Sequence, residues 1–273
     1  MKPIIIKRKY KNPIIAIIIL IIIISITYVV FAYRKAEAPK IPEIKNEVKS
    51  DIQKSATESK ENTNNKNIGT YKITKDFKVI PTDKNADKKV VLLTIDDGPS
   101  SQSSDIVKTL TDANIHAIFF INGTNIKAHP DALKQEFAAG NMIGNHTWDH
   151  KNLHLIKDET AKKEIDMNTD IIVKETGVKP IFFRSPFGAL TTFAKDYTEK
   201  EGMFPFNWSD AALDWEKNTK DKKVFIANVI KGIGPGSIIL MHEHPWSRDA
   251  LPDLIKEIKS KGYTFVDPKD IVK

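Results

Sequence analysis

Five short segments of the sequence combine residue types that can do acid–base or metal chemistry. The first places Asp96 next to Asp97, directly before Gly98-Pro99. Two adjacent carboxylates where a buried strand meets a Gly-Pro turn are unusual. Asp-Gly is also ordinary turn chemistry, so this segment alone does not separate a catalytic site from a turn.

The second segment, His-Thr-Trp-Asp-His, spaces His146 and His150 four residues apart. On a helix this spacing puts both imidazoles on one face, where they can share a metal ion. An isolated pair is equally compatible with two surface histidines near a turn. With a carboxylate from another strand end, the pair would form a two-histidine, one-carboxylate site that leaves positions open for water and substrate.

The remaining segments contribute Arg184, Asp214 and His242. An arginine beside an aspartate pair can orient one carboxylate and keep it ionised. A histidine with a carboxylate partner is a credible general acid. Each also has an ordinary alternative, a surface charge for the arginine and a satisfied near-core residue for the histidine.

The elements that must position these residues alternate along the chain from residue 89 onward. Strands are expected at 90–95, 115–121, 142–145, 181–183, 204–208, 237–241 and 263–266. Helices are expected at 103–113, 130–139, 158–176, 192–201, 221–231 and 249–261. Alternating units indicate an α/β fold with a parallel sheet. Seven strands, with no glycine-rich nucleotide loop after the first, favour a small, distorted (β/α)7-type barrel, whose reactive groups lie at the carboxyl ends of the strands.

Taken in order, these segments resemble the motifs of the polysaccharide deacetylase family, also called carbohydrate esterase family 4 or the NodB homology domain. The similarity covers about 89–267 and points to peptidoglycan N-acetylglucosamine deacetylases. Residues 94–99 are similar to the family's Thr-Phe-Asp-Asp-Gly-Pro, with Ile95 in place of Phe. The other similar segments are 146–150 (His-Ser/Thr-x-x-His), 184–188 (Arg-x-Pro-aromatic-Gly), 210–215 (Asp-x-x-Asp-Trp) and 240–242 (Leu-x-His).

The resemblance implies a role for each of these residues. The implied metal ligands are Asp97, His146 and His150, which would bind one divalent ion, zinc in the first place, with Co²⁺, Mn²⁺ or Ni²⁺ as alternatives. The implied catalytic residues are Asp96 as general base, Arg184 as its support, His242 as general acid and Asp214 as the partner of His242. The implied substrate contacts are Phe187 through its backbone N–H, and Trp215 and Leu240 around the acetyl methyl group.

The activity implied by the resemblance is hydrolysis of the acetamide of N-acetylglucosamine-type residues, with release of acetate. Peptidoglycan is the expected polymer. Chitooligosaccharides and exopolysaccharides are alternative substrates. Two other hypotheses are a glycan-binding member of the fold that has lost activity and a different amide hydrolase on the same barrel.

The formal charge of +7, from 42 Lys and Arg against 35 Asp and Glu, does not lie on the predicted domain. Residues 1–12 carry +5 and residues 34–88 carry +4, whereas residues 89–273 carry −2. A nucleic-acid-binding protein needs a basic face on its folded part, so no nucleic-acid partner is expected. The absence of cysteine excludes disulfides and thiolate ligands.

Residues 13–33 carry no charge and are dominated by isoleucine. As a helix they would be about 30 Å long, which matches a bilayer core. We therefore expect a single-pass membrane anchor at 13–33, a basic tail at 1–12 inside the cell and an extracytoplasmic catalytic domain. A signal peptide cleaved near Ala36-Glu37-Ala38, which would give a secreted form, is the alternative. The other expected segments are a tether at 34–68, a short extension at 69–88, the catalytic domain at 89–267 and a tail at 268–273; the oligomeric state is not predicted.

Overall fold

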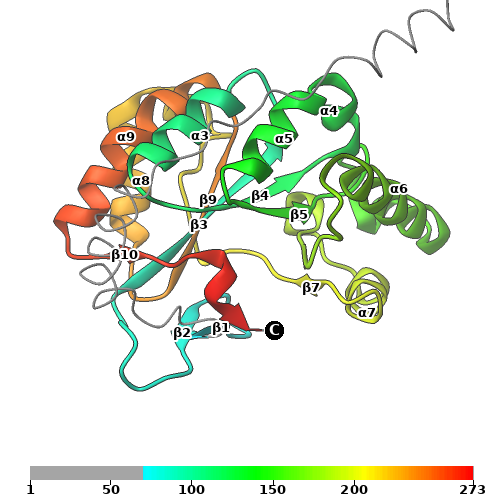
Figure 1. Ribbon diagram of the computed structural model, residues 1–273, viewed down its shortest axis with the longest axis horizontal. Coiled ribbons are helices and arrows are strands. Elements are labelled where there is room, and N and C mark those ends of the chain that lie inside the picture. Colours follow the sequence, from blue (N-terminus) through cyan, green and yellow to red (C-terminus); the bar gives the residue numbers. More distant parts are fainter. Residues whose placement is uncertain (1–69, 273) are drawn as a thin grey trace, which may run out of the picture. The chain divides into compact units, whose positions relative to one another are not determined.

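The computed structural model describes residues 70–272, which form one large and one small β-sheet with helices around them (Figure 1). The large sheet is parallel, with the hydrogen-bonded order β7-β6-β5-β4-β3-β9-β8, and β10 pairs with the start of β3. Its strands are β3 (Val90–Gly98), β4 (Ile118–Ile121), β5 (Met142–Asn145), β6 (Phe182–Phe183), β7 (Phe204–Pro205), β8 (Asp210–Ala211), β9 (Ser237–His242) and β10 (Thr264–Phe265).

Helices follow most of the strands, as expected for repeated βα units. In Figure 1, α3, α8 and α9 lie together beside β3 and β9. The helices are α3 (Ser103–Asp112), α4 (Gly123–Ala128), α5 (Pro130–Ala138), α6 (Asp158–Thr176), α7 (Thr192–Lys200), α8 (Lys222–Gly232) and α9 (Pro245–Ser260).

The two faces of β3 belong to different parts of the core. Val91, Leu93 and Ile95 pack with the residues of α3, α8 and α9. Val90 and Leu92 pack on the opposite face, among the aromatic rings of Phe120, Phe182 and Phe206. Because side chains alternate along a strand, Thr94 and Asp96 continue this second, inner face toward the carboxyl end of the sheet. Asp96 pairs in register with His242 of β9.

The parallel sheet curls but is not closed by hydrogen bonds between β7 and β8, so the barrel prediction holds for the strand order and not for closure. Both strands are only two residues long. The residues between them bond to the neighbours on either side: Phe206 N–H donates to Phe183 O, and Ser209 N–H donates to Ile238 O. The segment 204–211 thus spans the gap between β7 and β8. It is hydrogen-bonded to β6 at one end and to β9 at the other.

Most predicted elements of the domain are present, and several have different ends. β5 and α6 have the predicted limits. The predicted strand 204–208 is reduced to β7, β8 follows where no strand was predicted, and α4 is an additional short helix. The predicted helix 249–261 begins earlier, at Pro245, because a proline is well suited to the first helical position.

The segments 69–88 and 268–273 together supply the small sheet, in the order β11-β1-β2. The prediction that 268–273 is only a tail is wrong. Ile271–Val272 (β11) pairs with Tyr71–Ile73 (β1), which pairs in turn with Val79–Pro81 (β2). This sheet is joined to the large one where Val79 N–H donates to Gly236 O at 2.8 Å. Gly236 has φ +79°, and a Cβ there would lie 2.3 Å from Val79 O, so only glycine permits this approach.

The predicted tail, anchor and tether at 1–12, 13–33 and 34–68 lie outside the described residues. Among residues 70–272, no helix is both long and apolar enough to cross a bilayer.

We predict that Ile271→Ala lowers the free energy of unfolding by about 2–4 kcal/mol, because it empties a site packed against the core. Ile271 is 8% exposed and belongs to the cluster that contains Val79 and Val90. Its neighbour Val272 is 40% exposed, so Val272→Ala is the matched control and should change stability by less than about 0.5 kcal/mol. Urea unfolding of both variants measures the difference; equal losses would show that β11 is not anchored in the core.

Candidate active site

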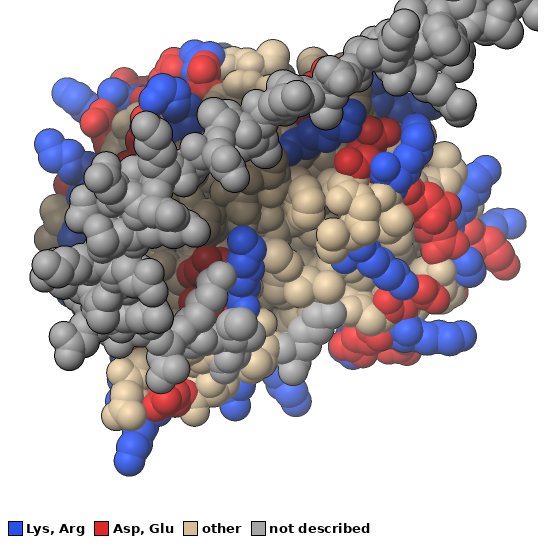
Figure 2. Space-filling model, in the orientation of Figure 1, with Lys and Arg blue, Asp and Glu red and all other residues tan. Residues whose placement is uncertain are grey.

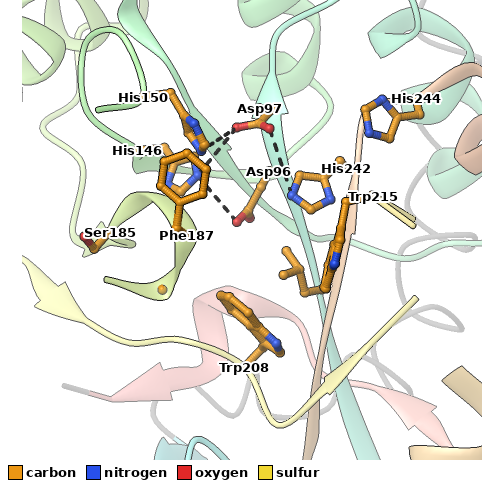
Figure 3. Close-up of a pocket in the computed structure, with 12 residues that line it drawn as sticks. Asp96, Asp97, His146, His150, Ser185, Phe187, Trp208, Trp215, His242 and His244 are labelled. Atoms are coloured by element: carbon orange, nitrogen blue, oxygen red, sulfur yellow. Dashed lines mark ion pairs between the residues drawn. The ribbon is translucent and has the colours of Figure 1, made fainter. Parts of the chain in front are cut away.

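A pocket of about 430 Å³ opens at the carboxyl ends of β3, β5, β6 and β9 (Figure 3). It contains most of the side chains that the sequence singled out: Asp96, Asp97, His146, His150, Phe187, Trp215, Leu240 and His242. Arg184 and Asp214 do not line the pocket, but each directly contacts a residue that does.

A buried ion pair lies at the base of the pocket. Arg184, which is fully buried, donates from Nη1 to Asp96 Oδ1 at 2.7 Å and to Thr94 Oγ1 at 2.8 Å. Its other nitrogens donate to the main-chain oxygens of Phe206 and Asn207. Burial raises the pKa of the Asp96 carboxyl, and the charge of Arg184 acts in the opposite direction.

Asp97 faces the same pocket as Asp96 because the strand is irregular at this point. Successive side chains of a regular strand point to opposite faces. Here the pairing of β3 with β4 shifts between Asp96 and Gly98, and Asp97 has φ +65°. This bulge turns the second carboxylate toward the pocket, and Asn125 Nδ2 holds the Asp97 carbonyl at 2.8 Å.

The two histidines of the second segment meet Asp97 from a loop. Their Nε2 atoms lie 3.5 Å (His146) and 3.4 Å (His150) from Asp97 Oδ1, and Figure 3 shows the three side chains pointing toward one another. The expectation that the pair shares one helical face is wrong. Thr147 and His150 have φ of +68° and +59°, which excludes a regular helix and bends the chain until both rings face the carboxylate.

This group of three residues has the composition of a site for a divalent ion. Ligand atoms of Asp97, His146 and His150 all lie within 4.8 Å of one another. Asp97 Oδ1 is buried and has no hydrogen-bond partner among the described residues, as expected for an atom reserved for a cation. His146 Nδ1 lies 2.7 Å from the Arg184 carbonyl, which leaves Nε2 for the ion, and burial lowers the pKa of His146 to about 3, so its imidazole is neutral.

His242 and Asp214 form a second pair on the opposite wall of the pocket. His242 Nδ1 lies 2.7 Å from Asp214 Oδ1, and the His242 backbone N–H donates to Asp214 Oδ2, also at 2.7 Å. Ser247 Oγ donates to the same Oδ2 at 2.7 Å. Burial alone would lower the pKa of His242, but the hydrogen bond and charge of Asp214 outweigh it and raise the pKa to about 9. At neutral pH the ring carries a proton on Nε2, which faces Asp97 Oδ2 at 4.0 Å.

The outer walls of the pocket are aromatic and partly exposed. Phe187 is 66% exposed and Trp215 is 47% exposed, whereas Leu240 of β9, which also lines the pocket, is buried. Phe187 has φ +60°, and its ring contacts that of His150 at a tilt of 59°, with ring centroids 4.6 Å apart. Trp215 meets the edge of His242 at 5.6 Å. The walls are therefore suited to an extended ligand with apolar faces.

Comparison with known proteins identifies the family. The sequence model described as polysaccharide deacetylase matches residues 83–205. A peptidoglycan-N-acetylglucosamine deacetylase of Bacillus cereus is 32% identical over 188 residues, which cover 66% of this chain and 69% of that protein. The chain belongs to the polysaccharide deacetylase family. The predicted enzyme class is confirmed by this membership.

Other members of the family differ in the sugar that their names give. The peptidoglycan-N-acetylmuramic acid deacetylase PdaA of Bacillus subtilis is 30% identical over 194 residues, covering 69% of this chain and 73% of that protein. The Bc1960 peptidoglycan N-acetylglucosamine deacetylase, solved with 4-naphthalen-1-yl-N-oxidanyl-benzamide, superposes with a TM-score of 0.62 at 30% identity. That match covers 66% of this chain and 86% of the solved one.

One detail of the motif comparison is wrong. Three residues separate Asp210 from Asp214, whereas the family pattern Asp-x-x-Asp-Trp has two. Asp210 lines a different cavity, with Lys231 and Asn228, and burial raises the pKa of its carboxyl to about 7. In this family member, only the Asp214–Trp215 end of the segment belongs to the active site.

The sequence did not single out four residues that also line the pocket: Ser185, Gly188, Trp208 and His244. Ser185 and Gly188 lie inside the motif at 184–188, and His244 follows His242 by two residues. Their closeness in sequence to motif residues could therefore have predicted that they line the pocket. Trp208 had none, since it stood at the end of a predicted strand. It reaches the pocket because segment 204–211 crosses the gap in the sheet.

We predict that Asp97→Asn lowers the affinity for Zn²⁺ at least 10-fold, because Asp97 is the one anionic ligand among the three residues and the amide removes its negative charge. Isothermal titration of the metal-free protein measures the change. Asp210→Asn is the matched control, since it removes a buried carboxyl outside the pocket and should leave the affinity unchanged. Equal affinity of Asp97→Asn and the native protein would contradict the assignment of this site.

Proposed function

We propose that the chain is a metal-dependent N-deacetylase that removes acetyl groups from N-acetylglucosamine-type residues of a cell-wall glycan. The observation that carries the proposal is the arrangement of three groups around one pocket. A two-histidine, one-carboxylate cluster lies beside a carboxylate held by arginine and faces a histidine held by carboxylate. A substrate bound in this pocket would have one of its bonds within reach of a base, an acid and a cation site.

Asp97, His146 and His150 would hold the ion, with zinc the first candidate and Co²⁺, Mn²⁺ or Ni²⁺ as alternatives. When bound, such an ion supplies Lewis-acid chemistry that polarises a carbonyl group and acidifies water. The two imidazoles and one carboxylate leave coordination positions free, which a catalytic site requires.

Asp96 is suited to the role of general base. Arg184 occupies its Oδ1, while Oδ2 lies 3.7 Å from His146 Nε2 and faces the metal cluster. The carboxylate thus accepts a proton from the attacking water while its orientation is fixed. The negative oxygen that forms on the acetamide carbon would accept a hydrogen bond from the Phe187 backbone N–H.

His242 is suited to the role of general acid. An amine leaves only when it is protonated, and His242 carries its proton on the nitrogen that faces the pocket. Asp214 fixes the ring and stabilises its charged form. Proton transfer to the nitrogen accompanies cleavage of the C–N bond and gives acetate and a free amine. Leu240 and Trp215 would enclose the acetyl methyl group in a small apolar space.

Peptidoglycan is the proposed polymer because the named relatives act on it. The predicted anchor at 13–33 would place the catalytic domain on the outer side of the cell membrane, next to this substrate, with a cleaved and secreted form as the alternative. Nucleic acid is not a proposed partner. Acidic and basic side chains are interspersed over the uncovered part of the face in Figure 2, and residues 89–273 carry −2.

Asp96→Asn and His242→Ala should each lower turnover by about 10²–10⁴-fold, because each removes one proton-transfer group. Both variants should still bind Zn²⁺, since neither residue belongs to the cluster of ligands. Acetate release, measured beside a metal titration, checks both expectations. Full activity of Asp96→Asn would remove this residue as the base, and full activity of His242→Ala would point to another acid.

The zinc-loaded domain should release acetate from peptidoglycan or from N-acetylglucosamine oligomers, and a chelator should stop the release. Mass spectrometry of the glycan fragments then reports both the reaction and the sugar that has lost its acetyl group. Chitin oligomers and an acetylated exopolysaccharide test the alternative substrates. No acetate from any of these glycans with metal-loaded protein would contradict the proposal and favour a glycan-binding role.

A further inference from the structure

Two glutamates outside the pocket are buried against each other. Glu136 of α5 is fully buried, and Glu243, the residue after His242, is 7% exposed. The charge of Glu243 acts directly on the Glu136 carboxyl. Neither carboxyl has an arginine, lysine or histidine partner among the ion pairs of the described residues. Two buried negative charges in contact would be strongly unfavourable, so the pair requires an explanation.

The hydrogen bonds around the pair assign a different state to each carboxyl. Ser100 Oγ and Ser103 Oγ both donate to Glu243 Oε2, at 2.6 Å and 2.7 Å. These hydroxyls are oriented as donors, because Ser100 Oγ accepts from Gln102 N–H and Ser103 Oγ accepts from Ser100 N–H. An oxygen with two such donors is typical of an ionised carboxylate.

The remaining oxygens have no donor. Glu243 Oε1 and both carboxyl oxygens of Glu136 are buried without a fixed donor among the described residues. A proton on Glu136 removes its negative charge and supplies a donor to Glu243 Oε1, and it leaves only the uncharged carbonyl oxygen of Glu136 without one. We propose that Glu136 is a neutral carboxylic acid at physiological pH, and that its hydrogen bond to ionised Glu243 holds the His242 end of β9 against the turn that follows Asp96 and Asp97.

The geometry of that turn supports the second half of the proposal. Glu243 Oε1 lies so close to Gly98 that a Cβ there would be 2.3 Å from it. The Glu243 backbone N–H donates to Asp96 O at 3.3 Å, and its side chain holds Ser100. One residue therefore connects the strand end that carries the proposed acid with the strand end that carries the proposed base and a metal ligand. Glu136 is a positioning residue, which acts on the site only through Glu243.

The charge state has a consequence for stability. Burial raises the pKa of Glu136 well above its ordinary value, and the charge of Glu243 adds to this effect. Glu243 is the one charged group among the described residues that acts on Glu136. A carboxyl that stays protonated when folded but ionises when unfolded makes stability fall as pH rises above the unfolded value of about 4.3.

The test compares Glu136→Gln, which keeps a donor of the same shape, with Glu136→Leu, which removes it. An exposed glutamate on α6, Glu159, provides the control Glu159→Gln. At neutral pH the infrared difference spectrum, native minus Glu136→Gln, should contain the carbonyl band of a protonated carboxylic acid, and the control difference should not. The melting temperature of Glu136→Gln relative to the native protein should rise between pH 5 and pH 8.

The positioning effect rests on the proposed function and has its own readout. Glu136→Leu should lower the melting temperature by about 5 °C and kcat by about 10–100-fold, with little change in KM. Glu136→Gln should retain near-native kcat.

A missing acid band, together with stabilisation of the native protein by Na⁺ or Ca²⁺, would overturn the shared proton in favour of a bound cation. An acid band with unchanged kcat in Glu136→Leu would overturn the positioning role, and this outcome is distinct from a lack of deacetylase activity in the native protein.

Discussion

The buried ion pair of Arg184 and Asp96 is the interaction on which the rest of the site depends. Removing two charges from water is costly, and contact between them repays this only when their other donors and acceptors are also satisfied. Here the guanidinium is satisfied by Thr94 Oγ1 and two main-chain oxygens, and it lies over the Phe120 ring at 4.2 Å. The interior of the curled sheet therefore keeps the carboxylate oriented and away from bulk water, while the charge of Arg184 opposes the rise in pKa that burial causes.

The same arginine also connects the base to the metal cluster. Its side chain holds Asp96, while its main-chain carbonyl holds His146 Nδ1. Any displacement of the end of β6 would shift both at once, so the geometry of the base and that of a ligand are not independent. The pair of His242 and Asp214 is built separately, on β9 and the segment after β8, and reaches the others through the register between β3 and β9.

The sequence predicts well whatever depends on local patterns. Apolar runs identified the long buried strands, and their order indicated which side chains would meet at the carboxyl edge. The sequence does not predict the bulge at Asp97 or the left-handed residues Thr147 and His150, because these conformations are stabilised by contacts with distant parts of the chain. β8 and β11 were missed for a related reason. Each has two residues, too few for a periodic pattern, and each exists only because a partner strand lies beside it.

The pairing of β1 with β11 brings the two ends of the domain to one place. That place lies next to Val90 and Gly236, where β3 begins and β9 is about to begin, whereas the pocket lies where they end. The nine residues of β3 separate the two by about 30 Å. A polypeptide that leads into Thr70 thus joins the domain at the pole remote from the reactive groups. The carboxyl edge of the large sheet, where the pocket opens, is thus built without either end of the described domain.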